Sequence, residues 1–151
     1  MYKDIQGFLS AKTIAVVGAS RKDYSHSQQA MKVMLEKGQT VFPINPFEAE
    51  ILGHKSFKSI SDLPNNIDAA FIILRKERVL ALAREAAEKG IKYIWIHEKC
   101  TTQEIESITS NFDVKIISGE CYFMWAEPVN GVHKFHRFIR RIFDRNMPKS
   151  A

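Results

Sequence analysis

Short runs of β-branched and aliphatic residues alternate along this chain with longer amphipathic stretches, and this alternation limits the possible folds. Five runs are predicted to be strands: residues 13–17, 40–44, 68–74, 91–96 and 114–117. Apolar spacings of three and four predict helices over residues 27–37, 77–89, about 101–111 and 131–145. Such alternation is typical of parallel sheets, because parallel strands are joined by right-handed crossovers. The prediction is one α/β domain over residues 1–151, with a doubly wound, five-stranded parallel sheet and helices on both faces.

Between these elements, local signals mark where helices begin. Ser25, with Gln28 three residues later, is a candidate capping box for the first predicted helix, and Thr101 or Thr102 is a candidate cap for the third. Residues 47–67 show neither the apolar alternation of a strand nor the three-and-four spacing of a helix, and they are expected to be irregular.

The net charge of +5 is concentrated near the carboxyl end of the sequence. Residues 1–130 carry 16 Lys and Arg against 16 Asp and Glu, whereas residues 131–151 carry six against Asp144 alone. An apolar stripe in the same segment predicts a basic amphipathic helix at about 131–146. Its charged face is open to three uses: contact with solvent, with an acidic protein partner, or with ligand phosphates. Nucleic acid is disfavoured, because the aromatic residues follow helical spacing and are expected to be buried.

Targeting signals are not evident in the sequence. No apolar run approaches the ~20 residues of a membrane span, and the amino-terminal residues lead into no apolar signal segment. Cys100 and Cys121 form no CxxC pair, so no disulfide framework is expected. We expect a cytoplasmic protein that binds no membrane. The dense apolar run 121–125 is expected to pack the last predicted helix onto the edge of the sheet; lining one end of a ligand pocket and forming a homodimer contact are the alternatives.

The loops that follow the predicted strands are the candidate ligand-binding segments, because ligands of open α/β sheets lie at the carboxyl ends of the strands. In the first loop, Gly18 and Ala19 allow a sharp turn and a close approach of the backbone to an anion. Ser20 offers a hydroxyl, and Arg21 and Lys22 offer positive charge. The helix that follows adds free N–H groups at its N-terminus. This loop indicates phosphate binding.

The same loop differs from the nicotinamide-binding fingerprint. Ser20 and Asp23 stand where the second and third glycines of G-x-G-x-x-G would be, and Asn45-Pro46 replaces the acidic residue after the second strand. NAD is therefore disfavoured. A small NADP-dependent oxidoreductase stays an alternative, because Arg21 or Lys22 could meet a 2′-phosphate.

Several segments, taken together, resemble the stand-alone CoA-binding domain family, a Rossmann-like family related to the CoA-binding domain of the succinyl-CoA synthetase alpha subunit. Over roughly residues 10–121 these segments are IAVVGASRK, TVFPINP followed by EAEILGHKSFKSISDLP, IDAAFIILR, and GIKYIWIHEKCTTQE. The resemblance implies noncovalent binding of coenzyme A or an acyl-CoA, by a non-catalytic or regulatory module. An interaction protein that acts through the basic carboxyl-terminal helix is a further alternative.

The resemblance also implies which residues of this chain would contact CoA. The pyrophosphate would be held by Gly18, Ala19, Ser20 and Arg21. The adenosine would lie against Asn45, Pro46, Leu74 and Arg75. The candidates for the 3′-phosphate are Arg21, Lys22, Arg75 and Lys76. The pantetheine arm would leave the sheet at His97 and Glu98, where the family commonly has Gln and Gly.

The sequence predicts no catalytic residue and no metal site. Cys121 follows the fifth strand and could be a nucleophile, but packing beside Trp125 is favoured. His97 and Glu98 are adjacent on a strand and point to opposite faces, so they are not expected to form an acid–base dyad. His133 and His136 have the spacing of metal ligands on a helix, but no third ligand is evident.

Overall fold

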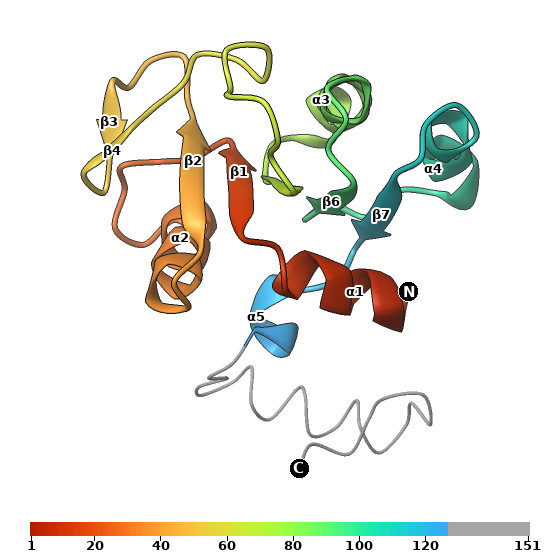
Figure 1. Cartoon of the computed structure of the whole chain (residues 1–151), viewed down its shortest axis with the longest axis horizontal. Helices are drawn as coiled ribbons and strands as arrows, with labels where there is room; N and C mark the ends of the chain where they lie inside the picture. The colour runs from red at the N-terminus through yellow and green to blue at the C-terminus, as the bar shows by residue number, and fades with distance from the viewer. Residues whose placement is uncertain (127–151) are drawn as a thin grey trace.

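The computed structural model describes residues 1–126 and contains a five-stranded parallel sheet (Figure 1). Its strands are β1 (Thr13–Val17), β2 (Thr40–Ile44), β5 (Ala69–Ile72), β6 (Tyr93–Ile96) and β7 (Lys115–Ser118). They are arranged in the order β2-β1-β5-β6-β7, so the connection reverses direction between β1 and β5. This is the doubly wound, Rossmann-like α/β fold that the alternation predicted. The predicted helix at about 131–146 lies outside the described residues.

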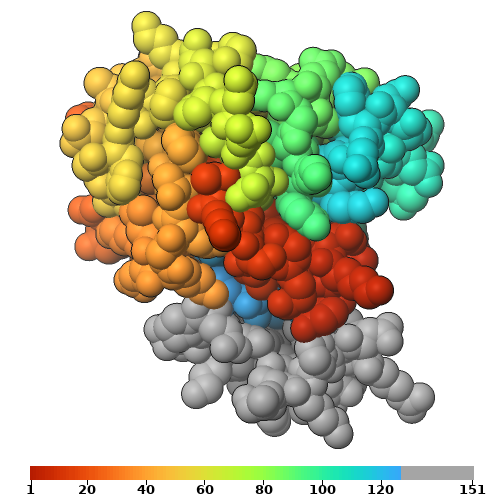
Figure 2. Space-filling model, in the orientation of Figure 1, coloured from red at the N-terminus to blue at the C-terminus, as the bar shows by residue number. Residues whose placement is uncertain are grey.

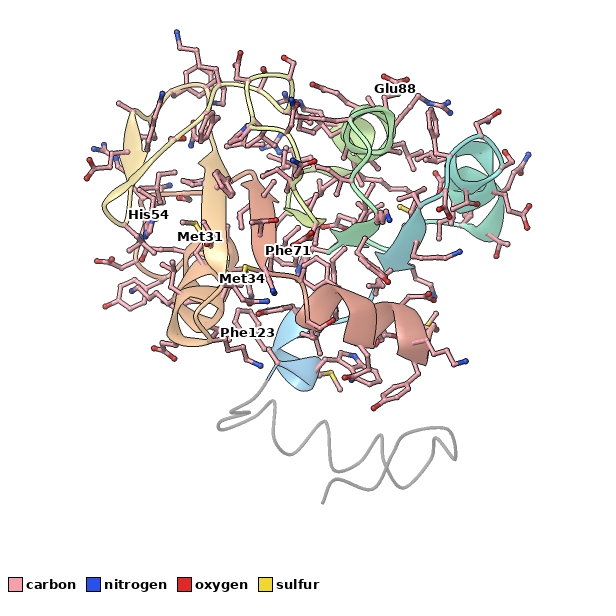
Figure 3. The ribbon with its side chains drawn as sticks, viewed as in Figure 1. Met31, Met34, His54, Phe71, Glu88 and Phe123 are labelled. Carbon is pink, nitrogen blue, oxygen red and sulfur yellow. The ribbon has the colours of Figure 1, made fainter. Side chains whose placement is uncertain are left out.

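Helices cover both faces of the sheet, as predicted. One face packs against α3 (Lys76–Glu88) and α4 (Thr102–Thr109), and its core includes Ala15, Ile72, Ile94, Ala83 and Ile108. The other face packs against α1 (Tyr2–Leu9), α2 (His26–Glu36) and α5 (Tyr122–Trp125). On that face Met31 and Met34 of α2 belong to the same buried cluster as Phe71 of β5 (Figure 3). No helix within residues 1–126 is long and apolar enough to cross a membrane.

The structure contains four elements that the periodicity did not predict: α1, β3, β4 and α5. Helix α1 has a glycine in its middle, which lowers its intrinsic helix propensity, but Ile5 and Phe8 are fully buried against the sheet. A Cβ atom at Gly7 would overlap the ring of Tyr93, so this helix packs very closely on β6. Its residues form part of the continuous red surface in Figure 2. Strands β3 (Glu50–Ile51) and β4 (His54–Lys55), of two residues each, form an antiparallel hairpin within the segment expected to be irregular. Helix α5 is a single turn.

The predicted caps are present at the starts of α2 and α4. Thr101 and Glu104 form a full capping box at the start of α4. At α2, the Ser25 hydroxyl accepts a hydrogen bond from the backbone N–H of Gln28, which is half of the predicted capping box. The Gln28 side chain does not return to Ser25 and instead donates to the carbonyl oxygen of Arg21 at 3.0 Å. The first turn of α2 therefore holds the loop that follows β1.

Asp68 joins the starts of β1 and β5, and its removal is expected to destabilise the fold. Its Oδ2 accepts hydrogen bonds from the backbone N–H groups of Lys12 and Thr13 and from the Thr13 hydroxyl, each at 3.0 Å. Burial raises the pKa of Asp68, but the hydrogen bonds from Thr13 and Lys12 outweigh it and leave that pKa below its ordinary value. We expect Asp68→Ala to lower the free energy of unfolding at pH 7 by about 1 kcal/mol, since these bonds are exposed to water.

The effect of Asp68→Ala should depend on pH. A carboxyl whose pKa is depressed by folding stabilises the native state above its unfolded pKa, and this contribution disappears as the pH falls through the folded value. The difference between wild type and Asp68→Ala in urea denaturation should therefore shrink below about pH 4. A difference that stayed constant between pH 7 and pH 3 would contradict this role of the carboxylate.

Candidate functional site

The loop after β1 makes a turn that only glycine fits well. Gly18 has a φ of +89°, and a Cβ atom there would overlap the carbonyl oxygen of Ile73, just beyond β5. The N–H groups of Gly18 and Ala19 both donate to the carbonyl oxygen of Ile44, at 3.2 and 3.3 Å. The loop is therefore fixed between the carboxyl ends of β2 and β5, beside the point where the strand order reverses.

These hydrogen bonds change which backbone groups of the loop are available to an anion. The N–H groups of Gly18 and Ala19 are already used, whereas those of Ser20 and Arg21 have no hydrogen-bond partner within residues 1–126. The Ser20 hydroxyl accepts a hydrogen bond from the N–H of Lys22 at 3.1 Å and keeps a proton to donate. The donors that can face a phosphate are therefore those of Ser20 and Arg21.

Asn45 links the loop after β1 to the loop after β2. Its side-chain Nδ2 donates to the carbonyl oxygen of Ala19 at 2.8 Å, and its Oδ1 accepts from the N–H of Phe47 at 2.9 Å. Because both polar atoms of the amide bond the protein backbone, Asn45 positions the two loops relative to each other. Pro46 lies between these contacts, in a turn whose shape the Asn45 side chain fixes.

A cleft of about 390 Å³ opens between these two loops and helix α3. Of the residues predicted for the site, it brings together Gly18, Ala19, Ser20, Asn45, Pro46 and Leu74. Apolar walls are supplied by Val17, Ile44, Ile60 and Leu82. Lys58 and Arg78 also line it, together with the carboxylate of Glu85. The cleft can therefore take a flat apolar group beside an anionic one.

Lys58 and Arg78 were missed by the sequence reasoning. Lys58 lies in the segment expected to be irregular, and Arg78 lies in the first turn of α3, away from any strand end. The sequence signal for Lys58 was a single positive charge in the segment FKSIS. No spacing rule connects this segment to the loop after β1.

A second, shallower cleft of about 690 Å³ adjoins the first. Arg21 and Lys22 line it, with Asn45 and Ser20 on the border of both clefts. Arg21 is held there by Glu48, whose Oε2 lies 2.8 Å from its Nε. Phe47 lines both clefts and is 90% exposed. Positive charge and an exposed aromatic ring therefore stand at the mouth of the apolar cleft.

Arg75 and Lys76 line neither of these clefts. Arg75 is the N-cap residue of α3. The Lys76 ammonium lies 4.0 Å from Oε1 of Glu104 on α4, so this side chain extends toward α4. The sequence placed these two residues with Leu74 because they adjoin it in the chain, but of the three only Leu74 lines the cleft beside α3.

His97 lies at the same edge of the sheet, on the side covered by α2. Its ring lies beside that of His26, the first residue of α2, with the centroids 5.6 Å apart and the ring planes tilted by 34°. The ring of Phe123 of α5 lies 6.5 Å from the His26 ring. Burial, and then the nearby His26, lower the pKa of His97, while Glu98 opposes them. The backbone carbonyl of Glu98 accepts from Gly119 and the Ser118 hydroxyl, which joins the ends of β6 and β7.

The last described loop is held by two tryptophans. Trp95 of β6 donates its Nε1–H to the carbonyl oxygen of Glu120 at 2.9 Å, and Trp125 donates to the Glu120 carboxylate at 3.0 Å. Cys121 is half-buried at the start of α5. Residues 1–126 contain no group of three or more side chains arranged to hold a metal; His133 and His136 lie outside them.

This arrangement agrees with a comparison to known families, in which the model of the CoA binding domain matches residues 12–126. The chain belongs to this CoA-binding domain family. The match contains all five sheet strands and helices α2 to α5, while α1 precedes it.

The proteins to which this chain is similar differ widely in length. The alpha subunit of acetate–CoA ligase (ADP-forming) II from Pyrococcus furiosus is 30% identical over 125 residues, which cover 76% of this chain but 27% of that subunit. An uncharacterised Bacillus subtilis protein, YneT, is 30% identical over 94 residues, which cover 62% of this chain and 70% of that protein. A conserved hypothetical protein from Pyrococcus furiosus has a solved structure with a TM-score of 0.65 and 32% identity, and the match covers 73% of this chain and 95% of that one. This chain thus spans about a quarter of the ligase subunit.

Proposed function

We propose that this protein binds coenzyme A or an acyl-CoA noncovalently, as a non-catalytic or regulatory module of the cytoplasm. The observation that carries the proposal is the cleft between the loop after β1, the end of β2 and helix α3. This cleft combines apolar walls with the two cations Lys58 and Arg78. Membership of the CoA-binding domain family supports the same ligand.

The adenine ring of CoA would occupy the apolar part of the cleft. Ile44, Pro46, Ile60 and Leu74 supply walls for a flat heterocycle, and burying such a group is favourable at roughly 25 cal/mol per Å² of apolar surface. The exposed ring of Phe47 at the mouth could cover the base once it is bound. This placement keeps Pro46 and Leu74 in the role that the family resemblance implied, while Asn45 acts by positioning the loops.

The phosphates would lie at two places. The pyrophosphate would meet the unpaired N–H groups of Ser20 and Arg21 beside the N-terminus of α2, where the helix dipole favours an anion. The 3′-phosphate would meet Lys58 and Arg78 in the cleft, in place of the cations that the sequence suggested for it. Arg21 and Lys22, at the adjoining cleft, would add charge near the pyrophosphate.

The proposal is tested by the thermal stability of the purified protein with CoA, acetyl-CoA, dephospho-CoA, NADP and NAD, each at 1 mM. A ligand present at about 100 times its Kd should stabilise the fold by about 2.7 kcal/mol. We expect stabilisation by CoA and acetyl-CoA, less by dephospho-CoA, and none by NAD. Stabilisation by NADP exceeding that by CoA would overturn the proposal in favour of the oxidoreductase alternative.

Removal of a cation from the cleft should weaken binding of CoA selectively. We expect Arg78→Ala to raise the Kd for CoA about tenfold, because a charge-assisted hydrogen bond contributes about 1.5–3 kcal/mol before screening by solvent. The Kd for dephospho-CoA, which lacks the 3′-phosphate, should change less than twofold in isothermal titration calorimetry. Arg75→Ala, on the same helix but outside the cleft, is the matched control and should change neither Kd. Equal effects of both substitutions on CoA would contradict the placement of the 3′-phosphate.

A further inference from the structure

Glu85 contributes a carboxylate to the cleft beside α3. Among the described residues that line this cleft it is the acidic one, and its side chain is half-buried. Lys89, four residues later on the same helix, could pair with it but donates to the carbonyl oxygen of Ser61 at 3.2 Å. Within residues 1–126 the Glu85 carboxylate makes neither a hydrogen bond nor an ion pair. It is therefore an available hydrogen-bond acceptor at the cleft.

Three residues of α3 line the cleft, and their chemistry changes along the helix. Arg78, Leu82 and Glu85 are separated by four and then three residues, so they share one face of α3. With a rise of about 1.5 Å per residue, Glu85 lies about 10 Å beyond Arg78 along the helix axis. This face of α3 therefore presents a cation, an apolar side chain and a carboxylate to the cleft, in that order.

The adenosine 3′-phosphate end of CoA carries matching groups in the same order: a phosphate, a purine ring and an exocyclic amine. With the phosphate at Arg78 and Lys58, the ring lies at Leu82 and the amine is directed toward Glu85. The reverse orientation would bring the phosphate against the Glu85 carboxylate, and like charges repel. The exocyclic amine holds the N–H donors of the adenine ring, and carboxylates accept hydrogen bonds from the exocyclic amines of bases.

We propose that Glu85 selects the base of the ligand, by accepting a hydrogen bond from the exocyclic amine of adenine. This inference rests on the proposed function, because it concerns the base of the same ligand. The amide of Asn45 could otherwise recognise adenine, but both of its polar atoms are already bonded to the backbone of Ala19 and Phe47. Guanine has a carbonyl oxygen in place of the amine, and the Glu85 carboxylate would repel it. Glu85 is thus a determinant of specificity for adenine.

The experiment compares CoA with an analogue in which unsubstituted purine replaces adenine, so that the exocyclic amine alone is missing. In isothermal titration calorimetry we expect the wild type to bind CoA about tenfold more tightly than the analogue. Glu85→Met has a side chain of similar length without an acceptor oxygen, and it should reduce this ratio to less than about twofold. Glu85→Gln keeps an uncharged acceptor and should retain a ratio of at least about threefold.

Glu88→Met is the matched control. Glu88, labelled in Figure 3, lies three residues further along α3, is exposed and lines neither cleft. Its substitution removes the same charge from the same helix and should leave the ratio of the two affinities unchanged. The two ligands carry identical phosphates, so a change in the general attraction of anions alters both Kd values together. The ratio therefore reports the contact with the amine.

The outcomes separate this inference from the proposed function. If CoA does not bind the wild type, both proposals fail. If CoA binds but the wild type binds the purine analogue as tightly, recognition of the amine is refuted and CoA binding stands. The same conclusion follows if Glu85→Met keeps the wild-type ratio, or if Glu88→Met lowers the ratio as much as Glu85→Met does.

Discussion

Gly18→Ala is expected to lower the free energy of unfolding by at least about 3 kcal/mol and to abolish binding of CoA. Two penalties combine at this residue. The φ of +89° is unfavourable for any residue with a Cβ, at a cost of about 1–2 kcal/mol. The added methyl group would also overlap the carbonyl oxygen of Ile73, which is backbone and cannot rotate away. Relief of that overlap must move the end of β1 away from β5, and with it the loop that forms the proposed pyrophosphate site.

Gly90→Ala is the control that isolates the collision. Gly90 has a φ of +86°, nearly that of Gly18, but nothing lies within 4 Å of the place where its Cβ would be. Gly90→Ala should therefore lower the free energy of unfolding by only about 1–2 kcal/mol and leave CoA binding intact. Urea denaturation of both variants measures the difference. If the two substitutions lower the free energy of unfolding equally, the close approach of the loop to Ile73 is not what requires a glycine at position 18.

Ser20→Asp should weaken CoA binding about 100-fold with little loss of stability. In the structure the Ser20 hydroxyl accepts a hydrogen bond from the N–H of Lys22, and an Asp carboxylate can accept the same bond. The loop should therefore keep its shape. The new charge would lie next to the pyrophosphate, where two like charges about 5 Å apart repel by about 3 kcal/mol at an effective dielectric constant of 20.

Ser20→Asn separates charge from size in this experiment. The amide has nearly the shape of the carboxylate and also accepts the N–H of Lys22, but it carries no charge. Its Kd for CoA should lie within about fivefold of wild type in isothermal titration calorimetry. A folded Ser20→Asp protein that bound CoA like wild type would place the pyrophosphate elsewhere. Equal weakening by Asp and Asn would point to steric exclusion instead of repulsion.

The two cations of the cleft show why only part of the candidate site was predictable. The loop after β1 and the Asn45-Pro46 turn were found because they follow strands directly, and the carboxyl ends of parallel strands meet at one edge. Lys58 and Arg78 come from a connection without periodicity and from a helix, so no rule of strand ends selects them. Arg75 and Lys76 were selected by that rule, but neither lines the cleft, and the Lys76 ammonium lies 4.0 Å from Glu104 of α4.

Asn45 and His97 illustrate a further limit of sequence reasoning. Both were predicted at the site, but the sequence does not tell which atoms of each remain available. The Asn45 amide is used by Ala19 and Phe47, and the Nδ1 atom of His97 is covered by the fold. The role of a polar side chain depends on its hydrogen-bond partners, and these come from segments distant in the chain.

The fold itself was determined largely by local pattern. The strand predictions Thr13–Val17 and Thr40–Ile44 agree with the structure at both ends. The run from Ile14 to Val17 is buried on both faces, as expected for an inner strand of a parallel sheet. Helix α1 was missed because a short helix with a central glycine has weak intrinsic propensity, and it is stabilised by the burial of Ile5 and Phe8 against the sheet. Periodicity thus determined the sheet and the edge at which we propose that the ligand binds. Packing between distant segments decided α1, the cation pair of the cleft and the burial of Nδ1 of His97, because each depends on neighbours that the chain supplies only when folded.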